Sequence, residues 1–219
     1  ATIMVLPKRY NENIIINKPL RLIGRSDIHQ AYGPDGNGAD GLWGGEPEIA
    51  STKGCTIMLS GNGKSNVLIR GFKIDSITGV GIASEVDLKN VIIENNIFTD
   101  NKNACIYFPD INTENVTIKN NRFICPINPD SYAVDLKMTG LRHNTGTVIC
   151  GNLFEGSKTG DTRGCGITLC GGKGPYISNN LFCKMKYPVK VMGSEDVICS
   201  YNQFSDSFNG LQFLSAKGY

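Results

Sequence analysis

Apolar and polar residues alternate along several short segments of the chain, and six of these segments are copies of one phrase. In "NVTIKNNRF" (115–123), Val116 and Ile118 are separated by one polar residue, and Phe123 follows two asparagines. A period of two is typical of β-strands, whose side chains point alternately to opposite faces. The other copies are "NVLIRGFKI" (66–74), "NVIIENNIF" (90–98), "GTVICGNLF" (146–154), "GPYISNNLF" (174–182) and "EDVICSYNQF" (195–204). The repeated unit is therefore predicted to consist of strands.

Aligning the six copies produces columns of similar residues. One column holds Asn96, Asn121, Asn152, Asn180 and Asn202; another holds Ile74, Phe98, Phe123, Phe154, Phe182 and Phe204; a third holds Ile69, Ile93, Ile118, Ile149, Ile177 and Cys199. Successive asparagines are 22 to 31 residues apart. This spacing is too short for the blade of a β-propeller, and the leucine pattern of leucine-rich repeats is absent. The columns therefore predict a β-solenoid with loops of unequal length.

A second short strand is predicted after each copy. Its inward-facing pairs are assigned as Val80 and Ile82, Ala104 and Ile106, Val134 and Leu136, Ile167 and Leu169, Val189 and Val191, and Leu211 and Phe213. Earlier in the chain, Ile57 with Leu59 and Ile3 with Val5 are assigned to the same column, whereas Ile14, Ile16, Leu20 and Leu22 form the other two strands of the first turn. These assignments predict about eight rungs of three strands each.

The motifs make the chain resemble the right-handed parallel β-helix, or pectin lyase-like, superfamily. The resemblance rests on a "G-I-x-L" strand, a "V-x-I" strand and an "N-N-x-F" corner, and it covers nearly the whole chain. It implies an all-β, single-domain right-handed parallel β-helix over residues 1–219, with a loop insertion at about 25–54. We expect the asparagine column to turn a left-handed corner and form an internal ladder of stacked amides, beside an internal stack of phenylalanines.

In this superfamily the outer face of the "G-I-x-L" sheet carries the polysaccharide cleft. The residues predicted to point outward there are Gly81, Cys105, Tyr107, Asp135, Lys137, Thr168, Cys170, Lys190 and Gln212. We select Tyr107, Asp135, Lys137, Thr168 and Lys190 as a candidate glycan face. The tyrosine ring is suited to stack on a sugar, and the charged side chains are suited to pair with hydroxyl or uronate groups.

No catalytic residue is assigned from the sequence. Pectate lyases of this fold hold calcium with several carboxylates, and glycoside hydrolases need a pair of acidic residues, whereas Asp135 is the only carboxylate on the predicted face. The chain has two histidines and no C-x-x-C motif, which argues against a zinc site. The glycine-rich segment 33–41 lacks ligand positions of a calcium loop. We therefore expect no bound metal and no cofactor.

Composition and charge limit the other classes of partner. Lysine and arginine number 22 and aspartate and glutamate 20, so a net charge of +2 gives no reason to expect a nucleic-acid partner. No apolar run reaches the length of about 20 residues that a membrane helix needs. The eight cysteines are predicted to fill core positions in preference to forming disulfides.

Both ends of the predicted solenoid carry apolar strands, with Ile3 and Val5 at one end and Leu211 and Phe213 at the other. Unpaired strand edges favour the addition of further strands. This favours a structural protein that is extracellular or at the cell surface and that assembles with itself or with neighbouring chains into a filament or a virion fibre. Two alternatives stay open: a polysaccharide-active lyase, hydrolase or epimerase, or a fragment of one, and a glycan-binding module.

Overall fold

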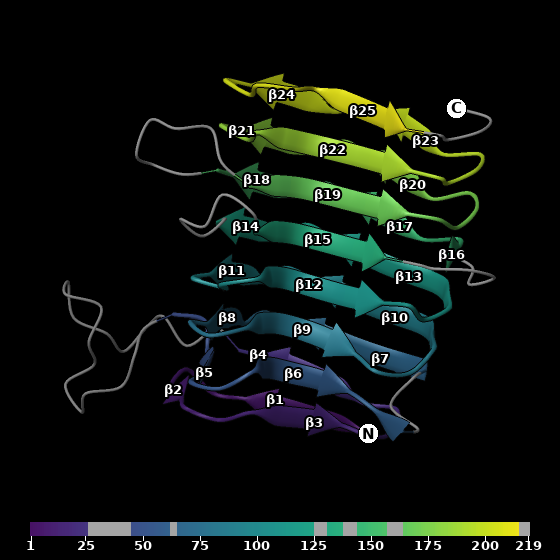
Figure 1. Cartoon of the computed structure of the whole chain (residues 1–219). Helices are drawn as coiled ribbons and strands as arrows, with labels where there is room; N and C mark the ends of the chain where they lie inside the picture. The colour runs from purple at the N-terminus through teal and green to yellow at the C-terminus, as the bar shows by residue number, and fades with distance from the viewer. Residues whose placement is uncertain (26–44, 62–64, 125–130, 138–143, 157–163, 215–219) are drawn as a thin grey trace.

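The computed structural model describes residues 1–25, 45–61, 65–124, 131–137, 144–156 and 164–214. In this part of the chain the regular structure consists of short strands, which form three parallel sheets. The strands stack in rungs from β1 (Thr2–Val5) at one end of the molecule to β25 (Leu211–Leu214) at the other (Figure 1). The prediction of an all-β solenoid with about eight rungs is confirmed.

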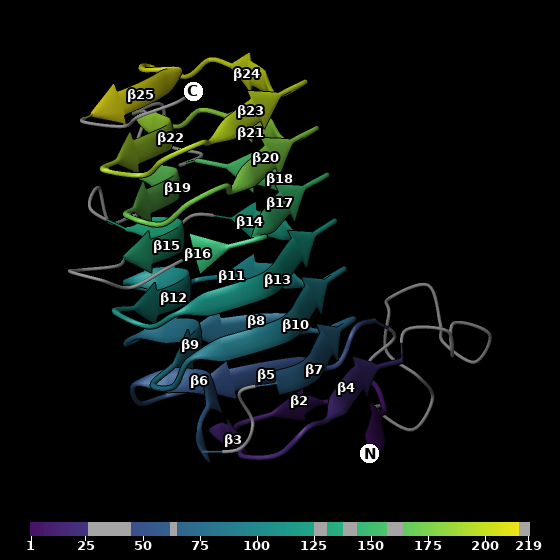
Figure 2. The same cartoon turned by 90° about the vertical axis from the view of Figure 1, so that its right-hand side faces the viewer.

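Each turn of the solenoid contributes one strand to each sheet (Figure 2). Sheet A contains β1, β4 (Arg21–Gly24), β7 (Ser65–Arg70), β10 (Leu88–Glu94), β13 (Thr113–Lys119), β17 (Val148–Cys150), β20 (Tyr176–Ser178) and β23 (Ile198–Ser200), and the short β16 (Asn144–Thr145) also pairs with β13. Sheet B contains β2 (Arg9–Tyr10), β5 (Glu48–Ser51), β8 (Lys73–Ser76), β11 (Ile97–Thr99), β14 (Arg122–Ile124), β18 (Leu153–Glu155), β21 (Leu181–Cys183) and β24 (Gln203–Ser205).

Sheet C completes each turn and contains β3 (Ile14–Ile16), β6 (Cys55–Leu59), β9 (Val80–Ser84), β12 (Ala104–Pro109), β15 (Tyr132–Lys137), β19 (Cys165–Cys170), β22 (Tyr187–Met192) and β25. Every strand pairs with its equivalent in the rungs before and after it, so equivalent residues lie about 4.8 Å apart along the axis. Ile118, for example, is in register with Ile93 and Ile149. The sequence columns are therefore columns in space.

The predicted phenylalanine stack lies inside the solenoid. The rings of Phe98, Phe123, Phe154, Phe182 and Phe204 are stacked, with successive centroids 4.6 to 5.3 Å apart. The first four side chains are fully buried. Inward-facing isoleucine, valine and leucine side chains from the three sheets join them in one continuous core.

The predicted asparagine ladder is also present. Asn96 Nδ2 donates to Asn121 Oδ1 at 3.1 Å, and Asn121 Nδ2 donates to Asn152 Oδ1 at the same distance. The ladder continues through Asn180 to Asn202. One part of the prediction is wrong: the left-handed corner residue is the one before each ladder asparagine, such as Asn120 with φ 54°. The ladder residue itself is free to turn its amide inward, because its neighbour makes the corner.

The strands of the first rung were assigned to the wrong sheet. Ile3 pairs with Leu22 in sheet A, whereas Ile14 and Ile16 pair with Ile57 and Leu59 in sheet C. Ile3 and Val5 therefore do not belong to the Ile57 column. Period-two alternation fits a strand of any sheet, and the first rung lacks the asparagine and phenylalanine that mark the later corners.

Two inward pairs of sheet C were predicted two residues too early. Ile106 and Phe108 are in register with Val134 and Leu136, so the inward pair of β12 is Ile106 and Phe108. Ala104 is instead in register with Tyr132. Val80 is in register with Ala104 and shares its place on the outer surface. The error arose because Val80 and Ala104 are apolar, although both line the groove on the outer face of sheet C.

The segment predicted as an insertion (25–54) includes β5, which pairs with β2 and β8 and is therefore part of the solenoid. Residues 26–44 of this segment lie outside the described residues. The seven cysteines in the described part of the chain carry free thiols, and Cys105 and Cys165 are buried. No helix among these described residues has the length and apolarity that would span a membrane.

Candidate functional site

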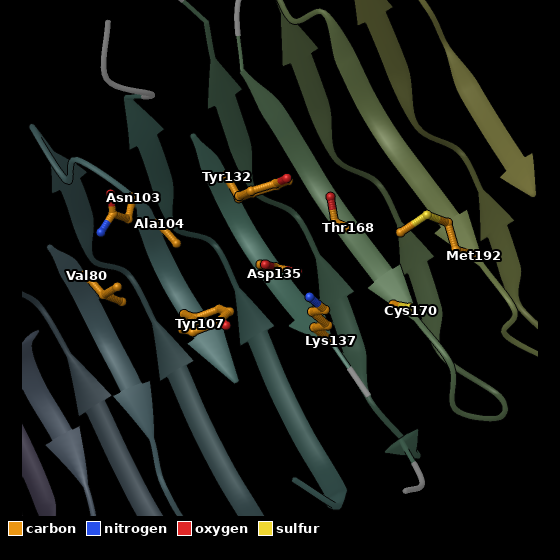
Figure 3. A pocket seen from close by; sticks show the side chains of 10 residues that line it. All are labelled: Val80, Asn103, Ala104, Tyr107, Tyr132, Asp135, Lys137, Thr168, Cys170 and Met192. Carbon is orange, nitrogen blue, oxygen red and sulfur yellow. The ribbon is translucent and has the colours of Figure 1, made fainter. Parts of the chain in front are cut away.

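A groove of about 520 Å³ crosses the outer face of sheet C (Figure 3). Its lining comes from consecutive strands β9, β12, β15, β19 and β22 and from the residue before β12. The lining residues are Val80, Asn103, Ala104, Tyr107, Tyr132, Asp135, Lys137, Thr168, Cys170 and Met192. The groove therefore runs across the strands, along the axis of the solenoid.

The centre of the groove is a row of side chains held by strand register. Tyr107 on β12 pairs with Asp135 on β15, which pairs with Thr168 on β19. Lys190 on β22 continues the row. Each residue lies between two inward-facing apolar residues, such as Val134 and Leu136 around Asp135, so the pleat directs it outward. The row presents one side chain about every 4.8 Å.

The structure brings together four of the five residues selected from the sequence. Tyr107, Asp135, Lys137 and Thr168 all line the groove. Lys190 lies in the same row beyond Thr168, with its Nζ 5.8 Å from the centre of the Tyr187 ring. Cys170 also lines the groove, as its predicted outward orientation requires.

Gly81 and Cys105 do not point outward, and this prediction is wrong. Cys105 is fully buried, and Asn101 Nδ2 contacts its Sγ at 3.8 Å. A Cβ added to Gly81 would lie 3.1 Å from the ring of Phe98, which is a core residue. In β12 two successive residues, Cys105 and Ile106, are both fully buried, so strict alternation fails there.

Sequence reasoning missed Tyr132 and Met192, which both line the groove. Tyr132 lies two residues before the inward Val134, so strict alternation predicts that Tyr132 faces inward. In the structure it lies in the same row as Val80 and Ala104, which line the groove. Met192 is in register with Cys170 and Lys137. Both residues could have been found from their register partners on neighbouring strands, which requires a correct alignment of the strands.

Asp135 has an unusual environment for a carboxyl group. Its side chain lies on the floor of the groove and is 7% exposed. Burial raises its pKa from 3.8 to about 6, and the positive charge of Lys137 opposes this rise only in part. Within the described residues no ion pair joins Asp135 to a lysine or an arginine.

This environment lowers the stability of the fold at neutral pH. The unfolded chain ionises Asp135 near pH 3.8 and the folded protein near pH 6, so the free energy of unfolding falls as pH rises through this window. The total loss is about 3 kcal/mol, from 1.36 kcal/mol for each pH unit. Groups held at a cost to stability are concentrated at functional sites, which makes Asp135 the strongest candidate in the groove.

Thr168 is the second polar group of the groove floor. The side chain is 4% exposed, and its Oγ1 has no hydrogen-bond partner among the residues described. A buried hydroxyl without a partner costs free energy that a ligand or a water molecule can recover. The unsatisfied hydroxyl of Thr168 therefore lies on the strand next to the buried carboxyl group of Asp135.

The described groove residues include one carboxylate, one ammonium group, two phenols and one hydroxyl. This set can bind and orient a polar ligand, and the two tyrosine rings offer apolar faces beside it. Among the described residues, no group of three histidine, cysteine, aspartate or glutamate side chains is arranged to hold a metal ion.

Three parallel sheets with one strand of each per turn define a parallel β-helix. The sequence model of the right-handed β-helix region matches residues 10–140, and the chain belongs to this family. A search of curated proteins found no match.

Two solved structures are similar to this chain over most of its length. One is an alginate lyase from Paenibacillus sp. str. FPU-7, with 12% identity over 96% of this chain and 90% of that chain and a TM-score of 0.43. The other is the tailspike protein gp49 of Acinetobacter baumannii bacteriophage Fri1, a capsular polysaccharide depolymerase, with 11% identity and a TM-score of 0.38. The match covers 98% of this chain and 56% of the tailspike. At these TM-scores and identities neither likeness carries an argument about this chain.

Proposed function

We propose that the groove on sheet C binds an extended polysaccharide chain outside the cell or at its surface. The observation that supports this proposal is the row of Tyr107, Asp135 and Thr168, which places one side chain per rung along the groove. A spacing of about 4.8 Å is close to the length of one sugar unit in an extended chain. Consecutive rungs therefore contact consecutive sugars.

The lining suits a sugar more than a purely apolar ligand. Tyr107 and Tyr132 supply aromatic faces, and Asp135, Lys137 and Thr168 supply hydrogen-bonding groups. Binding is proposed in preference to hydrolysis, because the described lining residues hold one carboxylate and hydrolysis of a glycosidic bond ordinarily uses two.

We expect the protein to be retained by at least one member of a panel of neutral and anionic polysaccharides in affinity electrophoresis. Tyr107→Ala should weaken that binding by tenfold or more, which corresponds to about 1.4 kcal/mol. Tyr176→Ala, on the outer face of sheet A, is the matched control and should bind like the wild type. Failure of the whole panel, or equal binding by Tyr107→Ala, would refute the proposal.

We propose as a second function that the ends of the solenoid associate with other copies of the chain. The end rungs expose apolar side chains: Ile3 is 47% exposed at one end and Leu211 is 44% exposed at the other. Val5 lines a hollow of about 480 Å³ at the first rung, and Phe213 packs at the edge of the core in the last. Further strands that add to these edges would bury this surface.

Ile3→Asp and Leu211→Asp are expected to abolish filaments of the protein seen by electron microscopy, because each places a charge between stacked rungs. Ile92→Asp is the control, since Ile92 lies on the outer face of sheet A and is 36% exposed. A wild-type protein that stays monomeric at high concentration, or filaments that persist in both end variants, would exclude this second function.

A further inference from the structure

Asp135 lies in the groove among neighbours that leave its charge uncompensated. The groups facing it in the described part of the chain are Tyr107 from β12, Tyr132 and Lys137 from its own strand, and Thr168 and Cys170 from β19. Lys190 on β22 lies one strand further along the row, beside Thr168. Lys137 reduces the pKa rise of Asp135 but forms no ion pair with it. Lys190 has its ammonium over the Tyr187 ring.

The geometry distinguishes two states of the groove. With Asp135 ionised, the negative charge of its carboxylate lies in the groove without an ion pair and repels an anionic group on a ligand. With Asp135 protonated, the carboxyl group becomes a hydrogen-bond donor beside the hydroxyl of Thr168, and no negative charge opposes the attraction of Lys137 for an anion. The protonated groove therefore offers two adjacent donors and a net positive charge.

We propose that protonation of Asp135 controls whether the groove accepts sugars with an anionic substituent. In the acidic state, Asp135 and Thr168 donate to oxygens of that substituent, while Lys137 and Lys190 balance its charge. In the alkaline state, the Asp135 carboxylate excludes the anionic substituent. Neutral sugars bind with the same affinity in both states. This inference rests on the proposed function of the groove.

The burial of Asp135 sets the pH at which the groove changes state. Burial raises the pKa of Asp135 to about 6, so the change of state falls between weakly acidic and neutral pH. The carboxylate of a sugar acid is ionised throughout this range, as is any sulfate group, so Asp135 is the group that titrates. Binding of an anionic sugar above this pKa must therefore be accompanied by uptake of one proton.

Isothermal titration calorimetry tests the switch with two matched probes. One is an oligosaccharide of uronate residues, and the other is the same oligosaccharide with its carboxylates reduced to alcohols. Between about pH 6.5 and 8, the affinity of the wild type for the uronate probe should fall by up to about tenfold for each pH unit. Affinity for the reduced probe should not change with pH.

Two variants identify the group responsible. Asp135→Asn keeps a donor and removes the charge, so its affinity for the uronate probe should be independent of pH and clearly above that of the wild type at pH 8. Thr168→Val removes the neighbouring donor and should weaken uronate binding at acidic pH without moving the midpoint. Proton uptake, measured in buffers of different ionisation enthalpy, should be close to one in the wild type and absent in Asp135→Asn.

Three results would overturn the inference. The first is a uronate affinity that does not change with pH in the wild type while the reduced probe binds, and this result leaves the proposed function intact. The second is a pH dependence that persists unchanged in Asp135→Asn. The third is the failure of both probes to bind at any pH; if the polysaccharide panel also fails, the proposed function fails with it.

Discussion

Phe123→Ala is expected to lower the free energy of unfolding by about 3–5 kcal/mol. Phe123 is fully buried, with its ring between those of Phe98 and Phe154 at centroid distances of 4.9 and 4.8 Å. Alanine would leave a cavity that neighbouring rungs cannot close, because each is fixed by backbone hydrogen bonds to the next. Equilibrium unfolding in urea, monitored by circular dichroism, measures the loss.

The control for this change is Phe208→Ala, since the Phe208 side chain is 76% exposed. Removing an exposed ring should change the free energy of unfolding by less than about 0.5 kcal/mol. A loss below about 1 kcal/mol in Phe123→Ala would contradict its placement in the core.

The fold could be predicted from the sequence because a parallel solenoid turns repetition into contact. Phe98 and Phe123 occupy equivalent places in successive copies, and in the structure they are direct neighbours. Ile3 was misplaced because the first rung carries neither marker residue, and alternation alone does not distinguish one sheet from another. The repeats therefore predict the solenoid reliably, but they do not assign the strands of its first rung to the correct sheets.

The groove could be predicted in part, for the same reason. Tyr107, Asp135 and Thr168 fall between inward residues, and strand pleating then sets their direction. Tyr132 was missed because the two residues after it, Ala133 and Val134, are both fully buried, which breaks the alternation on which the prediction rests. The raised pKa of Asp135 was beyond sequence reasoning, because it depends on how deeply the groove buries the carboxyl group.

Asn121→Ala is expected to destabilise the protein by about 3–5 kcal/mol, because the amide joins three successive rungs. Its Oδ1 accepts from the backbone N of Asn96 at 3.0 Å, and its Nδ2 donates to the backbone O of Ile93 at 2.9 Å. Alanine would remove the acceptor of the buried Asn96 backbone N–H, and an unsatisfied buried group of this kind costs about 1–3 kcal/mol. It would also remove the side-chain donor to the carbonyl of Ile93. The two bonds to Asn96 and Asn152 within the ladder would be lost as well.

The matched control is Asn90→Gly, on the outside of the same sheet. Asn90 also belongs to a row of asparagines, and its Nδ2 donates to Asn66 Oδ1 at 3.4 Å, but this bond is exposed to solvent. Glycine tolerates its φ of 53°, and Gly146 already replaces asparagine in a later copy of the phrase. Urea unfolding of the two variants should therefore differ by at least about 2 kcal/mol. Equal losses would mean that the inner ladder contributes no more than a surface contact, and that the stacked strands alone hold the rungs together.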